Sequence, residues 1–344
     1  MTPRIAIIGA GAVGCLLGGR LTKAGHNVTL IDQWPEHVEV MKQRGLRLGG
    51  PDGEETIRVR ALHVHELQRE ASPFYAVFVA VKGYDTEWAT HLAVRYLDPS
   101  DGIVVGYQNG VNDQRIAAIA GRERTLGCVT LLDAGLVGPG YAARTDSGRL
   151  GFKLGELDGA DTLRARALVA VLNDVAPAAV TTNLWGERWS KLTLNCMANP
   201  LAALTGLGTA EVRTDPDARR LAVHLGAEAI QVGRALGHEV EPIWGIAPYR
   251  FVDAAAGWGM SELEDDISHD AKSRGSGRPS MLQDVLRGRR TEIDSLNGLV
   301  VAEGRRVGVA TPLNAAVVRL FHERGLDVAP DPSQLEPLLA MLPQ

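Results

Sequence analysis

A lysine and two asparagines recur at four-residue intervals in the segment 185–204, WGERWSKLTLNCMANPLAAL. In a helix this spacing places Lys191, Asn195 and Asn199 on one face. A lysine ammonium flanked by amides is suited to protonate an oxygen that gains negative charge during a reaction. A core helix whose lysine reaches water through its alkyl stem explains the same spacing. Pro200 lacks an amide hydrogen, which predicts a bend or an end of the helix just after Asn199.

A glycine-rich motif, GAGAVG, follows the first short apolar run, residues 4–8. A helix-like stretch and a second apolar run come next, which is the order of a dinucleotide-binding unit. In that unit the first glycine allows a tight turn, the second lets the backbone approach a pyrophosphate, and the third lets the helix pack on the strand. A purely structural turn would explain the glycines but not the order of the elements. The predicted cofactor contacts of the motif are Gly9, Gly11, Ala12, Val13 and Gly14.

An acidic residue, Asp32, ends the second apolar run, 18 residues after Gly14. A carboxylate at this position accepts hydrogen bonds from both ribose hydroxyls and repels a 2′-phosphate. It therefore favours NAD(H) over NADP(H). The alternative role is structural, as a cap for the helix predicted at residues 35–45.

Two more polar residues follow predicted strands, at the edge where open α/β sheets bind their ligands. Lys82 follows the strand at 75–81, either near the cofactor or as a solvated surface lysine. Asn109 follows the strand at 102–106, and the Asn-Gly pair at 109–110 predicts a tight turn. The Asn109 amide is therefore placed to bind nicotinamide or substrate.

Alternating strand and helix signals up to residue 182 predict an α/β domain with a doubly wound, Rossmann-type sheet. The other elements expected there are a hairpin at 46–60, a strand at 124–131, antiparallel edge strands at 141–145 and 150–154, a helix at 160–173 and a last strand at 178–181.

Helical periods replace strand signals after residue 182, which predicts an all-α second domain at 183–344. Its expected parts are helices at 215–236, 280–299 and 314–324, broken helices at 241–279, and a loosely packed tail from Gly325 with four prolines. On a continuous helix, Ser280 and Glu292 would be about three turns apart and near the same side. Their structural alternatives are a helix N-cap for Ser280 and a surface ion pair with Arg289 or Arg290 for Glu292.

The composition of the 344 residues excludes several classes of protein. The net charge is −5, from 36 basic and 41 acidic residues that are well mixed, so no nucleic-acid surface is expected. No apolar run approaches about 18 residues, so no membrane span is predicted. The three cysteines are far apart and predict neither a metal site nor a disulfide. The N-terminus carries no leader pattern, and a cytoplasmic protein is expected.

Four blocks of the sequence together resemble the ketopantoate reductase (2-dehydropantoate 2-reductase) family: GAGAVG at 9–14, QNG at 108–110, WSKLTLNCMANPLAAL at 189–204 and SMLQDVLRGRRTEIDSLNG at 280–298. The last two blocks are the most specific. The resemblance implies a Rossmann domain joined to an all-helical domain, with the active site in the cleft between them. It also implies that Lys191 is the general acid and that Glu292 binds the substrate hydroxyl. Ser280 would hold the substrate carboxylate, and Asn109, Asn195 and Asn199 would orient substrate and nicotinamide.

The expected reaction is reduction of a 2-oxo acid to a 2-hydroxy acid by NAD(P)H, with ketopantoate as the named small-molecule substrate and a homodimer as a possible assembly. Typical family members prefer NADPH and have a basic or neutral residue where Asp32 stands. The segment 241–279 is also longer than usual, and its aromatic residues could line or cover the cleft: Trp244, Tyr249, Phe251 and Trp258. A relative that uses NAD(H) on another oxo acid, and a dinucleotide sensor without catalysis, are the alternatives.

Overall fold

The computed structural model describes residues 3–51, 53–130, 134–145, 151–272 and 277–343, and these form two compact units. The first unit comprises Met1–Gln108 and Asn112–Leu184, and the second comprises Asn109–Val111 and Trp185–Gln344. The second unit thus begins two residues after the expected boundary, and the short segment around Asn109 groups with it.

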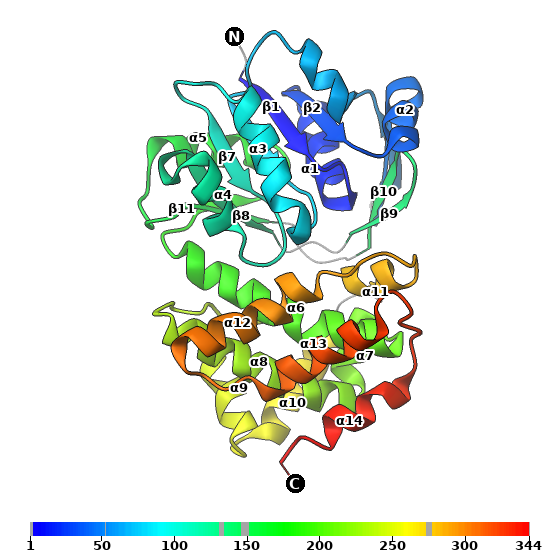
Figure 1. Ribbon diagram of the computed structural model, residues 1–344, viewed down its shortest axis with the longest axis vertical. Helices are drawn as coiled ribbons and strands as arrows, with labels where there is room; N and C mark the ends of the chain where they lie inside the picture. The colour runs from blue at the N-terminus through cyan, green and yellow to red at the C-terminus, as the bar shows by residue number, and fades with distance from the viewer. Residues whose placement is uncertain (1–2, 52, 131–133, 146–150, 273–276, 344) are drawn as a thin grey trace. The chain divides into compact units, whose positions relative to one another are not determined.

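An eight-stranded sheet forms the centre of the first unit, in the order β12-β11-β8-β7-β6-β1-β2-β5 (Figure 1). Its strands are β1 (Arg4–Ile8), β2 (Asn27–Asp32), β5 (Arg60–His63), β6 (Ala76–Val79), β7 (Ile103–Gly106), β8 (Thr125–Thr130), β11 (Phe152–Glu156) and β12 (Ala178–Val180). The six strands from β5 to β8 are parallel, and β11 runs antiparallel to β8. Chain order reverses between β1 and β6, which is the switch point of a doubly wound sheet. The predicted α/β class is confirmed.

Alternate residues of the central strands are buried on opposite faces of this sheet. On β1, Ile5 and Ile7 belong to one core cluster, and Ala6 and Ile8 belong to another. The first core includes residues of α1 (Ala12–Lys23), α2 (Pro35–Arg44) and α5 (Leu163–Asn173). The second includes residues of α3 (Thr86–Tyr96), α4 (Asp113–Ala120) and the 3₁₀ turn η1 (Val64–Arg69). Burial on both faces explains why these strands are short apolar runs in the sequence.

A second, four-stranded sheet has the order β4-β3-β10-β9. Its strands are β3 (Leu46–Gly50), β4 (Gly53–Ile57), β9 (Ala134–Gly138) and β10 (Tyr141–Arg144). The predicted hairpin at 46–60 is confirmed as β3–β4. The predicted pairing of 141–145 with 150–154 is wrong, because β10 pairs with β3 and β9 while β11 pairs with β8 and β12. The unpredicted strand β9 adjoins β10 through a two-residue turn with Gly140 at φ +65°, so the nearer partner forms the hairpin.

The second unit contains only helices and turns among its described residues: α6 (Leu184–Thr205), α7 (Thr209–Thr214), α8 (Pro216–Ala235), α9 (Pro248–Ala255), α10 (Met260–Lys272), α11 (Ser280–Val285), η4 (Ile293–Ser295), α12 (Asn297–Val307), α13 (Pro312–Arg324), η5 (Pro332–Leu335) and α14 (Glu336–Leu339). Two glycines of α8 permit close packing with α6. A Cβ on Gly226 would lie 2.8 Å from Met197 Sδ, and one on Gly233 would lie 3.1 Å from the Trp189 ring.

The continuous helix predicted at 280–299 is wrong. Helix α11 ends at Val285, where the Gly288 N–H donates to the Val285 carbonyl (3.0 Å) and the Arg289 N–H donates to the Asp284 carbonyl (2.9 Å). Gly288 has φ +60°. This is a Schellman ending, which a glycine at this position stabilises. Ser280 and Glu292 therefore do not share a helix face.

The predicted end of the helix after Asn199 is wrong, since α6 continues through Pro200 to Thr205. An interior proline costs about 3 kcal/mol or more, partly because the carbonyl four residues earlier loses its donor. That carbonyl belongs to Cys196, and the side chain of Asn297 donates to it at 3.4 Å. A tertiary partner thus takes the place of the missing backbone donor.

The C-terminal tail is packed rather than loose. Val328, Leu335 and Leu338 are buried in the helical core. The Asp331 N–H donates to the carbonyl of Leu204, the penultimate residue of α6, at 2.7 Å. The prolines of the tail interrupt regular structure, but its apolar side chains still reach the core.

Candidate active site

The three glycines of the GAGAVG turn have separate structural roles. Gly9 has φ +100°, and a Cβ there would lie 2.7 Å from the Val81 nitrogen. A Cβ on Gly14 would lie 2.0 Å from the Gly9 carbonyl oxygen, so this glycine permits close packing between helix and turn. A Cβ on Gly11, in contrast, would meet nothing within 4 Å. The backbone around Gly11 is therefore open to an approaching ligand.

The start of α1 is suited to an anion. Gly11 is the N-cap and offers no capping side chain, and the first turn contains no acidic residue. Ala12 and Val13 are the first two residues of the helix. Amide groups at a helix N-terminus carry a partial positive charge and lack intrahelical acceptors. The turn therefore has the donors and the space that a pyrophosphate requires.

Asp32 holds this turn from the end of β2. One carboxylate oxygen accepts the Ala10 N–H at 2.7 Å, and the other accepts the Trp34 N–H at 2.9 Å. Trp34 is the N-cap of α2, so this bond gives Asp32 part of the alternative role expected for it, which was to cap this helix. Each oxygen retains a further lone pair, so the carboxylate can still accept ribose hydroxyls.

A buried histidine supports the same turn. His37 Nε2–H donates to the Ala10 carbonyl at 2.8 Å, while the Gly140 N–H donates to Nδ1 at 2.8 Å. The imidazole stacks on Trp34, with ring centroids 5.3 Å apart and planes 8° from parallel. Burial lowers the pKa of His37, an effect that the nearby Asp32 carboxylate opposes. The imidazole is therefore held neutral in one tautomer, linking the glycine turn to the small sheet.

A cavity of about 1170 Å³ opens beyond Asp32 in the same unit, between the end of β2, η1 and α3. The described residues that line it include no acid; its polar members are Gln33, His63, His65, Gln68, Arg95 and Tyr96. The rings of His63 and His65 stack at 5.3 Å.

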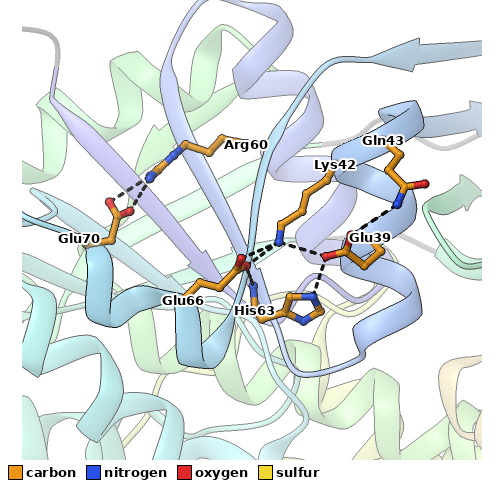
Figure 2. Close-up of polar contacts among 7 residues, drawn as sticks. All are labelled: Glu39, Lys42, Gln43, Arg60, His63, Glu66 and Glu70. Carbon is orange, nitrogen blue, oxygen red and sulfur yellow. Dashed lines mark hydrogen bonds and ion pairs between the residues drawn. The ribbon is translucent and has the colours of Figure 1, made fainter.

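Figure 2 shows how ion pairs fix η1, one wall of this cavity, to α2. Lys42 Nζ lies 2.8 and 2.7 Å from the two Glu66 carboxylate oxygens and 3.1 Å from Glu39 Oε1. The His63 N–H also donates to Glu66 at 2.8 Å. The hydrogen bonds from Lys42 and from the His63 backbone lower the pKa of Glu66 to about 2. Glu66 thus remains charged, and the wall of the cavity is held in place.

The two other candidates of the first half lie after strands, as expected. Lys82 is half-buried and precedes the turn η2 (Gly83–Asp85), three residues beyond the end of β6. Asn109 is half-buried, lies three residues beyond β7 and precedes Gly110, which has φ +79°.

In the helical unit, three of the predicted site residues form one hydrogen-bonded chain. The Asn199 carbonyl oxygen accepts the Ser280 hydroxyl and the Met281 N–H, both at 3.3 Å. The Asn199 amide nitrogen donates to the Asn195 carbonyl oxygen at 3.2 Å. The chain leaves the Asn195 amide nitrogen as a donor, and this buried atom has no hydrogen-bond partner among the described residues. Such an orphan donor costs about 1–3 kcal/mol and is satisfied when a ligand supplies an oxygen.

Lys191 and Glu292 belong to the same unit. Lys191 is half-buried on α6, one helical turn before Asn195. Glu292 is 4% exposed and precedes η4, so its side chain is buried rather than on the surface. Ser280 is the first residue of α11 and provides no side-chain cap. The three residues spaced four apart, Lys191, Asn195 and Asn199, thus share one helix, α6, whereas Glu292 lies on a turn that helical spacing does not predict.

The aromatic residues of segment 241–279 have different environments. Phe251 is fully buried in the helical core and does not line a cleft. Trp244 packs under the Arg213 guanidinium at 3.9 Å. Tyr249 and Trp258 are 53% and 77% exposed. Only the last two have the exposure that a cleft cover would need.

Comparison with known proteins supplies the remaining observation. A family model described as ketopantoate reductase PanE/ApbA matches residues 5–159, and a second, for its C-terminal part, matches residues 183–325. The 2-dehydropantoate 2-reductase of Archaeoglobus fulgidus is 30% identical over 94% of this chain and 98% of its own. The chain belongs to the ketopantoate reductase family.

Solved structures agree with this family. The 2-dehydropantoate 2-reductase of Geobacter metallireducens has a TM-score of 0.78 and 27% identity, covering 93% of this chain and 99% of its own. D-mandelate dehydrogenase with NADH and anilino(oxo)acetate has a TM-score of 0.80, covering 97% and 99%, and at 24% identity it shows the fold alone. As a ketopantoate reductase family member, this chain is an oxidoreductase that acts on CH–OH groups.

Two further observations concern the part of the chain that the structure describes. None of its helices is both long and apolar enough to cross a bilayer. No group of three or more His, Cys, Asp or Glu side chains in it is arranged to hold a metal ion.

Sequence reasoning missed two polar residues beside the predicted ones. His37 faces the core of the first unit with Val38 and Met41, a helical spacing that could have marked it as buried. Asn297 lies within the family-like block at 280–298, but its partners are on other helices, so spacing alone gives no signal.

Proposed function

We propose that the protein reduces ketopantoate to pantoate with a nicotinamide cofactor and that Lys191 is the general acid. The observation that carries the proposal is the chain from Ser280 through Asn199 to Asn195, which ends in a buried, unsatisfied N–H donor on the lysine helix. An oxygen-rich substrate supplies the acceptor that this donor lacks. Most buried side-chain donors are hydrogen-bonded, so an open donor on this helix favours a ligand as its acceptor.

The proposed chemistry divides between cofactor and protein. The cofactor supplies a hydride to the carbonyl carbon of the substrate. The carbonyl oxygen gains the electron pair of the broken C=O π bond, and Lys191 stabilises that charge and transfers a proton to it. Asn195 donates to a substrate oxygen, Ser280 binds the carboxylate and Glu292 accepts the substrate hydroxyl. Asn199 orients Asn195, and Asn109 contacts nicotinamide or substrate.

The glycine turn fits the proposed cofactor, since the open position at Gly11 and the start of α1 can receive its pyrophosphate. Asp32 supports a preference for NAD(H), because a carboxylate repels a 2′-phosphate. Lys82 is proposed to lie near the same ligand. The cavity beyond Gln33 supports the opposite preference, since Arg95 and His65 line it and are suitable donors for a phosphate. Comparing the kcat/KM for NADH with that for NADPH therefore tests whether Asp32 or the cavity beyond Gln33 decides the cofactor preference.

The test measures oxidation of NADH and NADPH by the purified protein with ketopantoate, benzoylformate and branched 2-oxo acids, with a substrate-free control. We expect turnover of ketopantoate and a higher kcat/KM with NADH. Lys191→Met is expected to lower kcat about 10²- to 10⁴-fold, the usual contribution of a positioned proton donor. Lys23→Met, at an exposed ion pair with Glu55, is the matched control. A Lys191→Met enzyme within about tenfold of the parent would reject the general-acid role.

A second candidate is reduction of a different 2-oxo acid by NADH. The D-mandelate dehydrogenase that shares this fold was solved with NADH and anilino(oxo)acetate, and Tyr249 and Trp258 of segment 241–279 are exposed aromatic residues that an aromatic substrate could contact. Turnover of benzoylformate without turnover of ketopantoate would select this candidate. Binding of NADH without turnover of any oxo acid would select a dinucleotide sensor. Light scattering of the same preparation tests the proposed homodimer.

A further inference from the structure

The interior proline of α6 lies immediately after the site amide Asn199. Pro200 has no N–H, so the carbonyl of Cys196, one turn earlier, has no helical donor. Cys196 itself adjoins Asn195 and is fully buried. The turn of α6 from Asn195 to Asn199 carries both site amides. The Cys196 carbonyl, which Pro200 leaves without a backbone donor, lies in this same turn.

A single side chain supplies a donor to that carbonyl. Asn297, the first residue of α12, is fully buried, and its amide nitrogen lies 3.4 Å from the Cys196 oxygen. The same nitrogen donates to the Asn314 carbonyl oxygen at 2.9 Å. Asn297 therefore uses both of its amide hydrogens inside the core.

The orientation of the Asn297 amide follows from the groups behind it. The Asn314 amide nitrogen donates to the Glu228 carboxylate at 2.7 Å and to the Leu225 carbonyl at 3.2 Å. Because both of these partners are acceptors, Asn314 must present its oxygen to Asn297. Asn297 must then present its nitrogen, which leaves the second hydrogen for Cys196. Glu228 also accepts the Leu313 and Asn314 backbone N–H groups at 2.9 Å, which fixes the far end of the chain at α13.

We propose that Asn297 is a positioning residue for the substrate amides: it replaces the hydrogen bond that Pro200 cannot make and so fixes the turn of α6 that carries Asn195 and Asn199. Without this donor the buried Cys196 carbonyl must tilt towards another partner, as carbonyls do at helix kinks. Tilting shifts Asn195 relative to Asn199, whose oxygen is held by Ser280 and the Met281 N–H. Misplacement of a positioning group by about 1 Å can lower activity about 10²-fold. The role rests on the proposed function of the two amides.

A double-mutant cycle tests the link between the proline and the asparagine. Asn297→Leu removes the donor at similar size, and Pro200→Ala restores a backbone N–H that can bond the Cys196 carbonyl. We expect Asn297→Leu to lower kcat/KM for the 2-oxo acid about tenfold or more in the parent, with the KM for the nicotinamide cofactor unchanged. In the Pro200→Ala background the same change should cost less than about threefold, because the carbonyl no longer depends on Asn297.

Asn314→Leu is the matched control. It breaks the same buried chain but leaves Asn297 able to donate to Cys196, so Pro200→Ala should not rescue it. Equal rescue of both variants, or no rescue of Asn297→Leu, would overturn the proposal.

Hydrogen exchange of peptides from α6 provides a readout that does not depend on turnover. Asn297→Leu should accelerate exchange in residues 192–200, and Pro200→Ala should reverse this. If this pattern is found in a protein with no oxo-acid activity, the proposed function fails and the positioning role of Asn297 stands. If activity is present and the pattern is absent, the positioning role fails alone.

Discussion

Replacing His37 by phenylalanine tests whether the small sheet supports the cofactor turn through one neutral imidazole. Phenylalanine keeps the planar ring that stacks on Trp34 but removes both nitrogens. The Gly140 N–H then loses its acceptor, and the Ala10 carbonyl keeps only the Cys15 Sγ–H at 3.0 Å. Since each buried, unpaired backbone group costs about 1–3 kcal/mol, we expect a local loss of about 2–4 kcal/mol.

The Gly140 amide itself reports this loss. In hydrogen exchange followed by mass spectrometry, the peptide 138–145 should exchange roughly 30- to 700-fold faster in His37→Phe, since about 1.4 kcal/mol corresponds to a factor of ten. Affinity for NADH, measured by fluorescence titration, should fall as well, because the Ala10 carbonyl is part of the turn. His91→Phe, at an exposed position of α3, is the control and should change local stability by less than about 0.5 kcal/mol.

The pH dependence of the difference follows from the lowered pKa of His37. Below the ordinary pKa of 6.5, the unfolded chain binds a proton that the folded imidazole refuses, so the parent loses stability as the pH falls. His37→Phe has no such proton uptake. The difference in stability between the parent and His37→Phe should therefore be largest above pH 7 and smaller at pH 5.5. Unchanged exchange at Gly140, or a gap equally large at pH 5.5, would refute the proposed role of the neutral tautomer.

Two further predictions concern the first unit. Gly11→Ala should raise the KM for NADH at least tenfold with an unchanged melting temperature, because its Cβ meets only open space. Gly14→Ala should instead lower the melting temperature, because its Cβ would lie 2.0 Å from the Gly9 oxygen. Steady-state kinetics and calorimetry of both variants check this, and equal melting temperatures of the two variants would contradict it. Glu66→Gln should cost about 1 kcal/mol in urea unfolding at pH 7. Since the pKa of Glu66 is lowered to about 2, its contribution to the free energy of unfolding is present above pH 4.5 and is lost as the pH falls through about 2. The difference in unfolding free energy between the parent and Glu66→Gln should therefore be smaller at pH 3 than at pH 7. Glu87→Gln, at an exposed pair with Arg115, is the control and should change stability by less than about 0.5 kcal/mol.

Sequence patterns correctly predicted the features that depend on residue spacing within a single helix, strand or turn. The glycine motif, the buried strands and the stripe on α6 each follow from spacing within one element, and all three are present. Errors arose where a tertiary partner or a turn overrides local spacing. The sequence around Gly288 continues a helical pattern, yet a left-handed glycine ends the helix. The sequence around Pro200 predicts a break, yet Asn297 supplies the missing donor.

The sequence predicts least well which amide atom of Asn195 and Asn199, the oxygen or the nitrogen, is available to a ligand. That orientation determines whether the site can bind a hydrogen-bond donor or an acceptor. Spacing places Asn195 and Asn199 on one face, but it cannot say whether oxygen or nitrogen points outward. The Met281 N–H and the Ser280 hydroxyl turn the Asn199 oxygen towards α11, which turns its nitrogen towards Asn195 and leaves Asn195 a donor. A site built from this donor and the Lys191 ammonium favours an oxyanion over a cation. The proposed preference for an acidic oxo substrate therefore depends on α11, an element more than 80 residues along the chain from Asn199, as much as on the lysine helix.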